Sequence, residues 1–306
     1  MSTSSPDAGG WPAGTPTTPD GLAPERPTHL LAHLSDTHLT SPGVAYNGVI
    51  DADATLDRAV QMLRAAIAGG AGIDAVVASG DLTDTGDPDA YRRVRTALES
   101  LEAPVIWATG NHDVRVAFHE HVLDLPDLPE PVLQVHDLSG LRMIVLDSTV
   151  PDSGIGILSP SHLAELADVL SSPAEHGSIV VLHHAPIPPP SPLLTYFALH
   201  RDSRAALAEA ITGTDVRMVL AGHHHLAQSG MLARVPVAVA GSIAIRTDPL
   251  APPGHEHTTR SASVNVVAVY PDTIVVSVVP VDGAETVFDL GPAECGVIVN
   301  GVRGAV

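Results

Sequence analysis

Short apolar runs recur along the first two-thirds of the chain, and segments with helical periodicity lie between them. The runs are rich in Val, Ile, Leu and Ala and are bounded by turn residues, which is typical of buried strands. They cover residues 30–34, 75–78, 104–108, 142–146, 179–182 and 216–220. Between them, apolar positions repeat at helical spacing and predict helices. These helices cover residues 51–67, 88–101, 159–170 and 202–211.

The last third of the chain is dominated by predicted strands, over residues 235–240, 264–270 and 273–281. The last two are joined by a Pro-Asp hairpin signal between Tyr270 and Thr273. Strands that alternate with helices and then predominate predict an α/β fold with a mixed sheet. The proline-dense stretch 186–192 is expected to be an ordered or rim loop.

The two ends of the chain differ in composition from the rest. Residues 1–28 are rich in Pro, Ser, Thr and Gly and predict a disordered N-terminal tail. We expect one domain over residues 29–290 and a C-terminal tail over 291–306. The N-terminal segment lacks an apolar signal-peptide core, and no apolar run approaches the roughly 18 residues of a membrane helix. The sequence therefore favours a cytoplasmic protein without a membrane span.

Composition narrows the function classes. The formal net charge is −20, and every cationic side chain is an arginine, because the sequence contains no lysine. So acidic a chain is a poor partner for nucleic acid, whose phosphate backbone requires a basic surface. It would also repel anionic substrates unless bound cations reversed the field locally. Cys295 is the only cysteine, so no disulfide can form within one chain.

Polar motifs follow five of the predicted strands. They are Asp36-Thr-His38, Gly80-Asp81, Gly110-Asn111-His112-Asp113, His183-His184 and Gly222-His223-His224-His225. Open α/β sheets bind their ligands at the carboxyl ends of strands. The motifs supply carboxylate oxygens, imidazole nitrogens and one amide oxygen, which is a ligand set for paired divalent cations. Paired cations catalyse displacement at phosphorus, so the pattern predicts a dinuclear phosphoesterase.

These motifs, in this order, resemble those of the calcineurin-like metallophosphoesterases, and in detail the bacterial class III cyclic-nucleotide phosphodiesterases. The similarity covers about residues 30–285 and includes three longer segments. They are His33-Leu-Ser-Asp-Thr-His38, Gly213-Thr-Asp-Val-Arg217 leading into Ala221-Gly-His223, and Val269-Tyr-Pro-Asp-Thr273. The resemblance implies a four-layer α-β-β-α metallophosphoesterase sandwich with two mixed sheets and the metals at one edge.

The resemblance also implies a role for each motif residue. The metal ligands would be Asp36, His38, Asp81, Asn111, His183, His223 and His225. Asp36, His38 and His225 would hold the first ion, and Asn111, His183 and His223 the second. Asp81 would bridge the two, and a carboxylate can do so with its two oxygens. The substrate would be bound by His38, Asn111, His112 and His225.

Catalytic roles fall to His112 and Asp84. The resemblance places His112 beside the leaving group without binding metal, and Asp84 would orient it. Asp113 is an alternative partner for His112 or a cap for the helix expected near residue 114. His184 and His224 are expected beside the ligands rather than among them. His33 is expected in the core, and His119 and His121 at the surface. The Gly254-His-Glu-His257 segment is expected to be a mobile loop that could line the pocket, and the role of the loop 246–263 stays open.

The resemblance favours hydrolysis of 3′,5′-cyclic nucleotides, chiefly cAMP, to 5′-monophosphates by in-line attack of a metal-bridging hydroxide. The alternative is a broader phosphodiesterase acting on 2′,3′-cyclic nucleotides, glycerophosphodiesters or nucleotide-sugar diphosphates. A non-catalytic scaffold is disfavoured, because every ligand position is filled. The position three residues after Asp81 holds Asp84 rather than the tyrosine of purple acid phosphatases. A purple acid phosphatase is therefore disfavoured.

Two departures also disfavour a protein phosphatase. Asp113 stands where those enzymes have Glu, and no arginine follows Asp84. The mixed oxygen and nitrogen donors suit two divalent ions of Mn, Fe, Co or Zn, and leave the metal open. The expected partner is a small-molecule phosphodiester, the cyclic nucleotide. The late Val-rich strands offer an edge for a homodimer, which the sequence does not settle.

Overall fold

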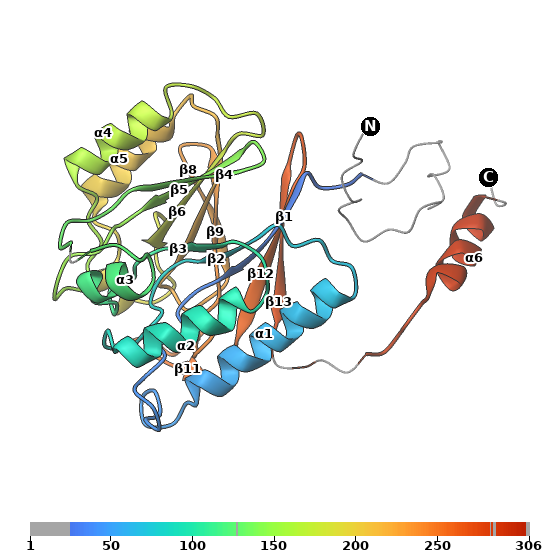
Figure 1. Cartoon of the computed structure of the whole chain (residues 1–306), viewed down its shortest axis with the longest axis horizontal. Helices are drawn as coiled ribbons and strands as arrows, with labels where there is room; N and C mark the ends of the chain where they lie inside the picture. Colours follow the sequence, from blue (N-terminus) through green and yellow to red (C-terminus); the bar gives the residue numbers. More distant parts are fainter. Residues whose placement is uncertain (1–24, 127, 282, 284–285, 304–306) are drawn as a thin grey trace.

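Two mixed β-sheets form the centre of the molecule (Figure 1). The computed structural model describes residues 25–126, 128–281, 283 and 286–303. The first sheet has the order β13-β12-β1-β2-β3. Its strands are β1 (His29–Leu34), β2 (Ala75–Ala78), β3 (Val105–Trp107), β12 (Ser263–Val269) and β13 (Ile274–Pro280). β1, β2 and β3 are parallel, whereas β12 and β13 add as an antiparallel hairpin.

The second sheet has the order β4-β5-β6-β7-β9-β8. Its strands are β4 (Gln134–Leu138), β5 (Leu141–Leu146), β6 (Ser178–His184), β7 (Val216–Gly222), β8 (Gln228–Leu232) and β9 (Val235–Val239). The four inner strands are parallel, and β4 and β8 close the two edges in antiparallel orientation. A small ribbon of β10 (Arg246–Thr247) and β11 (Thr258–Thr259) lies outside both sheets.

Helices cover the outer face of each sheet. The covering helices are α1 (Ala52–Ala68), α2 (Pro88–Glu99), α3 (Arg115–His121), α4 (Pro160–Val169) and α5 (Arg201–Ile211). The chain also has a short 3₁₀ helix, η1 (Leu194–Phe197), and a helix α6 (Pro292–Arg303) that lies apart from both sheets (Figure 1). Side chains of α1, α2 and α3 share an apolar cluster with β1 and β2, and those of α4 and α5 share one with β5, β6 and β7. The layers therefore run helix, sheet, sheet, helix, which confirms the predicted four-layer sandwich.

A third apolar cluster lies between the two sheets. Successive residues of a strand point to opposite faces, so each inner strand contributes to two clusters. In β6, Ile179 and Val181 pack between the sheets, while Val180 and Leu182 pack under the helices. This double burial explains why these strands read as continuous apolar runs rather than as alternating patterns.

Helix boundaries follow local chemistry. Asp51 caps α1 by accepting a hydrogen bond from Ala54 N at 2.9 Å, and Asp87 caps α2 by accepting one from Ala90 N at 3.0 Å. Pro88 and Pro160 occupy the first turns of α2 and α4, where a missing N–H costs no helical hydrogen bond. These residues fix where the loop ends and the helix begins.

Some elements differ from the predicted pattern. β4 and β8 were not predicted; both are partly exposed edge strands, and neither forms an apolar run. Helix α6 lies within residues 291–306, which the sequence assigns to a tail. Of the predicted N-terminal tail, residues 1–24 lie outside the described residues.

Among the residues that the structure describes, no helix has both the length and the apolarity to cross a bilayer. β13 forms an open sheet edge, and its use in a homodimer stays a prediction.

Truncation of the inter-sheet core tests this layering. Ile179 is fully buried between the sheets, so Ile179→Ala should lower the free energy of unfolding by about 2–5 kcal/mol. Val278→Ala on edge strand β13, where the side chain is 53% exposed, should cost less than about 1 kcal/mol. Urea denaturation followed by circular dichroism measures both. Equal losses would contradict the placement of Ile179 between two packed layers.

Candidate metal centre

The polar motifs meet at one edge of the sandwich, where the parallel strands of both sheets end. Asp36 follows β1, Asp81 follows β2 and Asn111 follows β3; His183 ends β6, and the 223–225 segment follows β7. Backbone hydrogen bonds join these loops. Asp36 N donates to Gly80 O at 2.9 Å and His38 N to Asp81 O at 3.0 Å. His223 N donates to Asp36 Oδ2 at 3.0 Å and so connects the loops of the two sheets.

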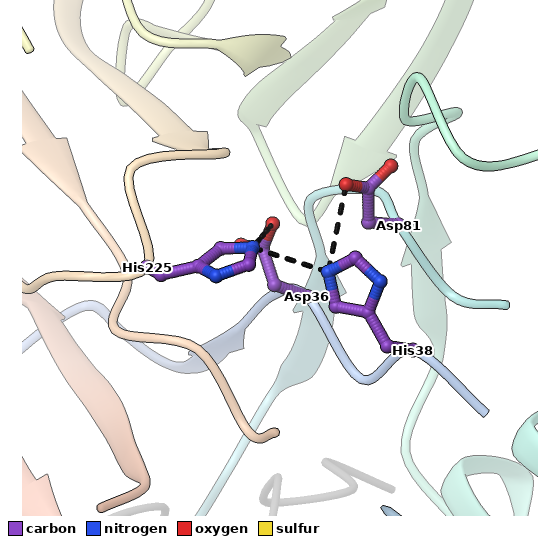
Figure 2. Close-up of side chains that lie close together, drawn as sticks. All are labelled: Asp36, His38, Asp81 and His225. Atoms are coloured by element: carbon purple, nitrogen blue, oxygen red, sulfur yellow. Dashed lines mark hydrogen bonds and ion pairs between the residues drawn. The ribbon is translucent and has the colours of Figure 1, made fainter. Parts of the chain in front are cut away.

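A first group of donors combines Asp36, His38, Asp81 and His225, whose ligand atoms lie within 4.8 Å of one another. His225 Nε2 is 3.2 Å from Asp36 Oδ1 and 3.1 Å from His38 Nε2. His38 Nε2 is in turn 3.7 Å from Asp81 Oδ2. Figure 2 shows the two imidazole rings and the two carboxylates pointing toward a common centre.

A second group gathers around His183 Nε2. This atom lies 3.3 Å from Asp81 Oδ2, 3.1 Å from Asn111 Oδ1 and 3.2 Å from His223 Nδ1. His183 Nδ1 is 2.8 Å from the carbonyl oxygen of Ser79, which assigns the proton of the neutral ring to Nδ1. The lone pair of Nε2 then faces the centre, where it can bind a metal ion. All residues predicted as ligands thus fall into one of two adjoining groups.

These distances fit metal coordination better than hydrogen bonding. Neighbouring donors about 2.1 Å from one cation lie roughly 3.0–3.4 Å apart at octahedral or tetrahedral angles. Two facing imidazole nitrogens can share only one proton, so hydrogen bonds leave several of these atoms unsatisfied. Asp36 Oδ1 is buried and has no hydrogen-bond partner among the described residues. The donor set therefore fits two adjoining divalent cations.

Asp81 joins the two groups through one oxygen rather than two. Oδ2 faces both His38 and His183, whereas Oδ1 accepts a hydrogen bond from His112 N at 2.8 Å. The expectation that Asp81 bridges two ions with its two oxygens stays a prediction; the structure shows that Oδ1 also accepts a backbone hydrogen bond. Oδ2 therefore faces both donor groups, and the hydrogen bond to Oδ1 holds the carboxylate in place.

The chain holds this geometry in strained backbone conformations. Five of the predicted ligands have positive φ values, which non-glycine residues seldom adopt. They are Asp36 at 55°, His38 at 45°, Asp81 at 51°, His223 at 71° and His225 at 50°. The tight bends turn each side chain inward within four residues of the end of its strand, so the donors converge over short loops.

Three glycines allow the loops to approach this closely. A Cβ atom on Gly110 would collide with the backbone nitrogen and carboxylate of Asp81, and one on Gly222 would collide with the hydroxyl of Ser35. Gly80 has φ +99°, and a Cβ there would lie 2.6 Å from His183 Nδ1. The glycines of these motifs therefore make room for ligands supplied by neighbouring loops.

Burial and charge oppose each other at the centre. Burial by itself raises the pKa of Asp81, but His183, His38 and His112 outweigh it and hold that pKa well below its usual value. Burial likewise lowers the pKa of His183, but Asp81 and Asp36 outweigh it and raise the pKa to about 9. The two buried carboxylates thus create a field that attracts positive charge to this position.

Asp84 lies between two of the predicted site histidines. Its Oδ1 is 3.2 Å from His112 Nδ1 and 3.7 Å from His38 Nδ1. Hydrogen bonds from these rings lower the pKa of Asp84 far below its ordinary value. Burial lowers the pKa of His112, but Asp84 and Asp81 outweigh it and raise the pKa to about 9. The His112 side chain is 41% exposed, whereas Asp36, His38, Asp81, His183 and His223 are buried.

Asp113 has a different position from either role considered for it. Its carboxylate accepts hydrogen bonds from the backbone nitrogens of Leu82 at 3.2 Å, Thr83 at 3.1 Å and Gly110 at 2.9 Å. It therefore fastens the loop after β2 to the loop after β3. It does not cap α3 (Arg115–His121), whose N-cap residue is Val114 and which has no side-chain cap hydrogen bond.

The surplus histidines are buried beside the centre. His184 Nδ1 lies 2.8 Å from Ser148 Oγ and its Nε2 3.1 Å from Gly154 O, while His224 Nδ1 lies 2.7 Å from Gln228 Oε1. His33 is fully buried, as expected. The expectation that His119 is exposed is wrong. It is 1% exposed, and its Nδ1 lies 2.7 Å from Leu128 O, because the short helix α3 turns this face toward the loop that follows it.

One residue beside the two donor groups was not identified from the sequence. Tyr46 lies in the loop before α1 and stacks on His38, with ring centroids 4.6 Å apart and planes inclined by 18°. It is 6% exposed, and burial raises its pKa above the usual value. No motif or period marks this tyrosine, because it packs from an irregular loop.

A cavity of about 390 Å³ opens over the centre. Its floor includes Asp81, Asn111, His112, His223 and His225, and its wall includes Asp152, Ser153, Gly154, Leu194 and Phe197. This volume lies within the range of about 300–1,000 Å³ that small-molecule sites occupy. The Gly254-His-Glu-His257 segment does not contribute to this lining.

A single methyl group tests the close approach of the loops. Gly110→Ala should displace Asp81 and lower the metal content after reconstitution from about two ions per chain to less than one. Gly283→Ala, whose Cβ would point into open space, should retain full metal content. Mass spectrometry of dialysed protein gives the stoichiometry. Full occupancy in Gly110→Ala would show that Asp81 does not need this clearance.

Comparison with known proteins places the chain. Residues 29–227 match the model of the calcineurin-like phosphoesterase family. A probable cyclic nucleotide phosphodiesterase of Rhodococcus erythropolis is 42% identical over 267 residues, covering 86% of this chain and 87% of that protein. A cAMP/cGMP dual specificity phosphodiesterase of Mycobacterium tuberculosis is 40% identical, with 86% and 82% covered.

A solved structure has a similar fold. A dimetal phosphatase from Danio rerio superposes with a TM-score of 0.61 at 14% identity, covering 84% of this chain and 97% of that one. The match to the family model and the near full-length relatives agree with the donor groups described above. This chain belongs to the calcineurin-like phosphoesterase family.

Proposed function

We propose that this protein is a metal-dependent phosphodiesterase that hydrolyses 3′,5′-cyclic nucleotides, chiefly cAMP, to 5′-monophosphates. The observation that carries the proposal is the convergence of two donor groups on Asp81 Oδ2 beneath an open cavity. The choice of substrate is supported by two relatives that are named as phosphodiesterases of cyclic nucleotides. Each alignment covers 86% of this chain.

The first ion would be held by Asp36, His38 and His225, and the second by Asn111, His183 and His223. Asp81 would contribute to both. The mixed oxygen and nitrogen donors suit Mn, Fe, Co or Zn ions. Such a pair supplies an ionised water as nucleophile and neutralises charge on the phosphate. Asn111 contributes a neutral oxygen, whereas a carboxylate at this position would add a negative charge. The second ion with its ligands would therefore keep more positive charge to attract an anionic substrate.

Proton delivery falls to His112. Its Nδ1 faces both Asp84 Oδ1, at 3.2 Å, and Asp84 O, at 3.1 Å, which makes Nδ1 a donor and leaves Nε2 for the cavity. Hydrolysis forms a new bond from the water oxygen to phosphorus and breaks the bond to the 3′ oxygen, which must gain a proton. Imidazolium at His112 can supply it, and Asp84 fixes the ring orientation and stabilises its charge.

Asp84 also supports the metal side of the site. Because Asp84 Oδ1 faces His38 Nδ1 at 3.7 Å, the opposite nitrogen of His38 is held toward Asp81 and His225. Tyr46 stacks against the same ring and limits its rotation. The charge of the carboxylate therefore favours a proton on His38 Nδ1, and the aromatic ring limits the tilt of this proposed ligand.

A substrate panel tests the proposed function. With the metal-reconstituted protein, we expect kcat/KM for 3′,5′-cAMP to exceed that for 2′,3′-cAMP and for a glycerophosphodiester by about tenfold or more, because that preference defines the proposed class. Product analysis by chromatography should give 5′-AMP. A protein that cleaves the other diesters and uses cyclic nucleotides most poorly would instead support the broader phosphodiesterase.

Separate variants distinguish metal binding from proton delivery. His112→Ala should keep both ions but lower kcat by about 10²–10⁴, the range typical of a general acid. Asp81→Ala should lose both ions and nearly all activity, since both donor groups share its Oδ2. Metal analysis and steady-state kinetics on the same preparations give both readouts. Loss of metal from His112→Ala would contradict its proposed role.

A further inference from the structure

The cavity has one apolar wall that the proposed chemistry does not use. We propose that Phe197, with Leu194 beside it, forms a platform on which the base of the substrate nucleotide stacks. The inference rests on the proposed function and deepens it by assigning the part of the site that recognises the nucleoside. It concerns residues outside the motifs that supply the metal donors.

The wall shares one cavity with the metal donors. Leu194 and Phe197 come from η1 and line the same 390 Å³ space as Asn111, His112 and His223. Phe197 is 40% exposed, so its ring packs on protein on one side and remains accessible on the other. The floor is polar, whereas the part of the wall formed by Leu194 and Phe197, beside Asp152 and Ser153, offers an aromatic ring and an aliphatic side chain. A phosphate held at the floor therefore places the rest of its molecule within reach of an aromatic surface.

The position of Phe197 is built into the fold. Its ring packs on Gly154, where an added Cβ would lie 2.6 Å from Phe197 Cδ1. His184 Nε2 lies 3.1 Å from the carbonyl oxygen of Gly154, and His184 Nδ1 lies 2.8 Å from Ser148 Oγ. The loop after β5 is thus fastened to the residue next to His183, so the platform is positioned relative to the metal donors.

Further hydrogen bonds join the loop after β5 to the segment that follows η1. His200 N donates to Gly156 O at 2.7 Å, and Gly156 N donates to Ala198 O at 3.3 Å. A Cβ on Gly156 would lie 2.5 Å from the ring of His184. The platform is therefore supported from two loops and is not a freely moving side chain.

A flat heterocycle is the occupant that this wall suits. Stacking on an aromatic ring is available to every nucleobase and to no part of a glycerol diester. Such a contact made far from phosphorus contributes mainly to substrate binding, since it is formed equally in the ground state and the transition state. Phe197 should thus lower KM for cyclic nucleotides and leave kcat unchanged.

The test compares ligands with and without a base. Phe197→Ala should raise KM for 3′,5′-cAMP and Kd for 5′-AMP by about tenfold or more, as expected for loss of one stacked base. KM for glycerophosphoethanolamine, Kd for ribose 5-phosphate, kcat and metal content should stay within about twofold. Phe197→Trp should restore tight binding, because it retains an aromatic face. Steady-state kinetics and isothermal titration calorimetry on metal-reconstituted protein give these values.

Tyr196→Ala is the matched control. Tyr196 is the adjacent aromatic residue, is 75% exposed and does not line the cavity, so its truncation should change none of these values. Equal effects of Phe197→Ala on ligands with and without a base, or no effect on either, would overturn the inference while leaving cAMP hydrolysis in place. Absence of cAMP turnover by the wild-type protein would overturn the proposed function and this inference with it.

Discussion

The site depends on one oxygen atom, Asp81 Oδ2, being shared by donors that come from two sheets. His38 reaches it from the first sheet and His183 from the second, at 3.7 and 3.3 Å. That meeting is possible only if the sheets pack in a fixed register, which the apolar cluster between them provides. Asp81 itself is held by a hydrogen bond from His112 N to Oδ1 and by the clearance at Gly110. Packing between the sheets thus helps to set the distances of 3.7 and 3.3 Å within the site.

The same arrangement is costly for the protein without cations. Asp36 and Asp81 are essentially inaccessible, and several ligands occupy left-handed backbone conformations that cost about 1–3 kcal/mol each. Like charges gathered in a buried space add to this cost. Cations that bind only the folded chain would offset it by mass action. They would also reverse the field of a chain with net charge −20, which otherwise repels an anionic phosphodiester.

Doubly buried strands and their terminal motifs were predictable from the sequence, because burial on both faces demands continuous apolar runs and parallel strands end at a common edge. The predicted strand 75–78 matches β2 without any shift. Contacts between distant segments were not predictable. Edge strands β4 and β8 face solvent and lack such runs. The stacking of Tyr46 on His38 and the burial of His119 depend on how irregular loops fold back. The hydrogen bond to Asp81 Oδ1 likewise depends on where His112 N lies.

Adjacent histidines at the end of β6 connect the two halves of the site. Successive strand residues face opposite ways, so His183 points to the donors and His184 to the loop carrying Gly154. The proposed metal donors lie at strand ends whose positions the core fixes. The apolar wall belongs to loops that are attached to these strand ends by a few hydrogen bonds. Loop sequences can therefore change the shape of the wall while the donor geometry stays constant. Selectivity for the organic part of a substrate and chemistry at phosphorus are thus physically separable in this fold, with His184 as the contact through which one positions the other.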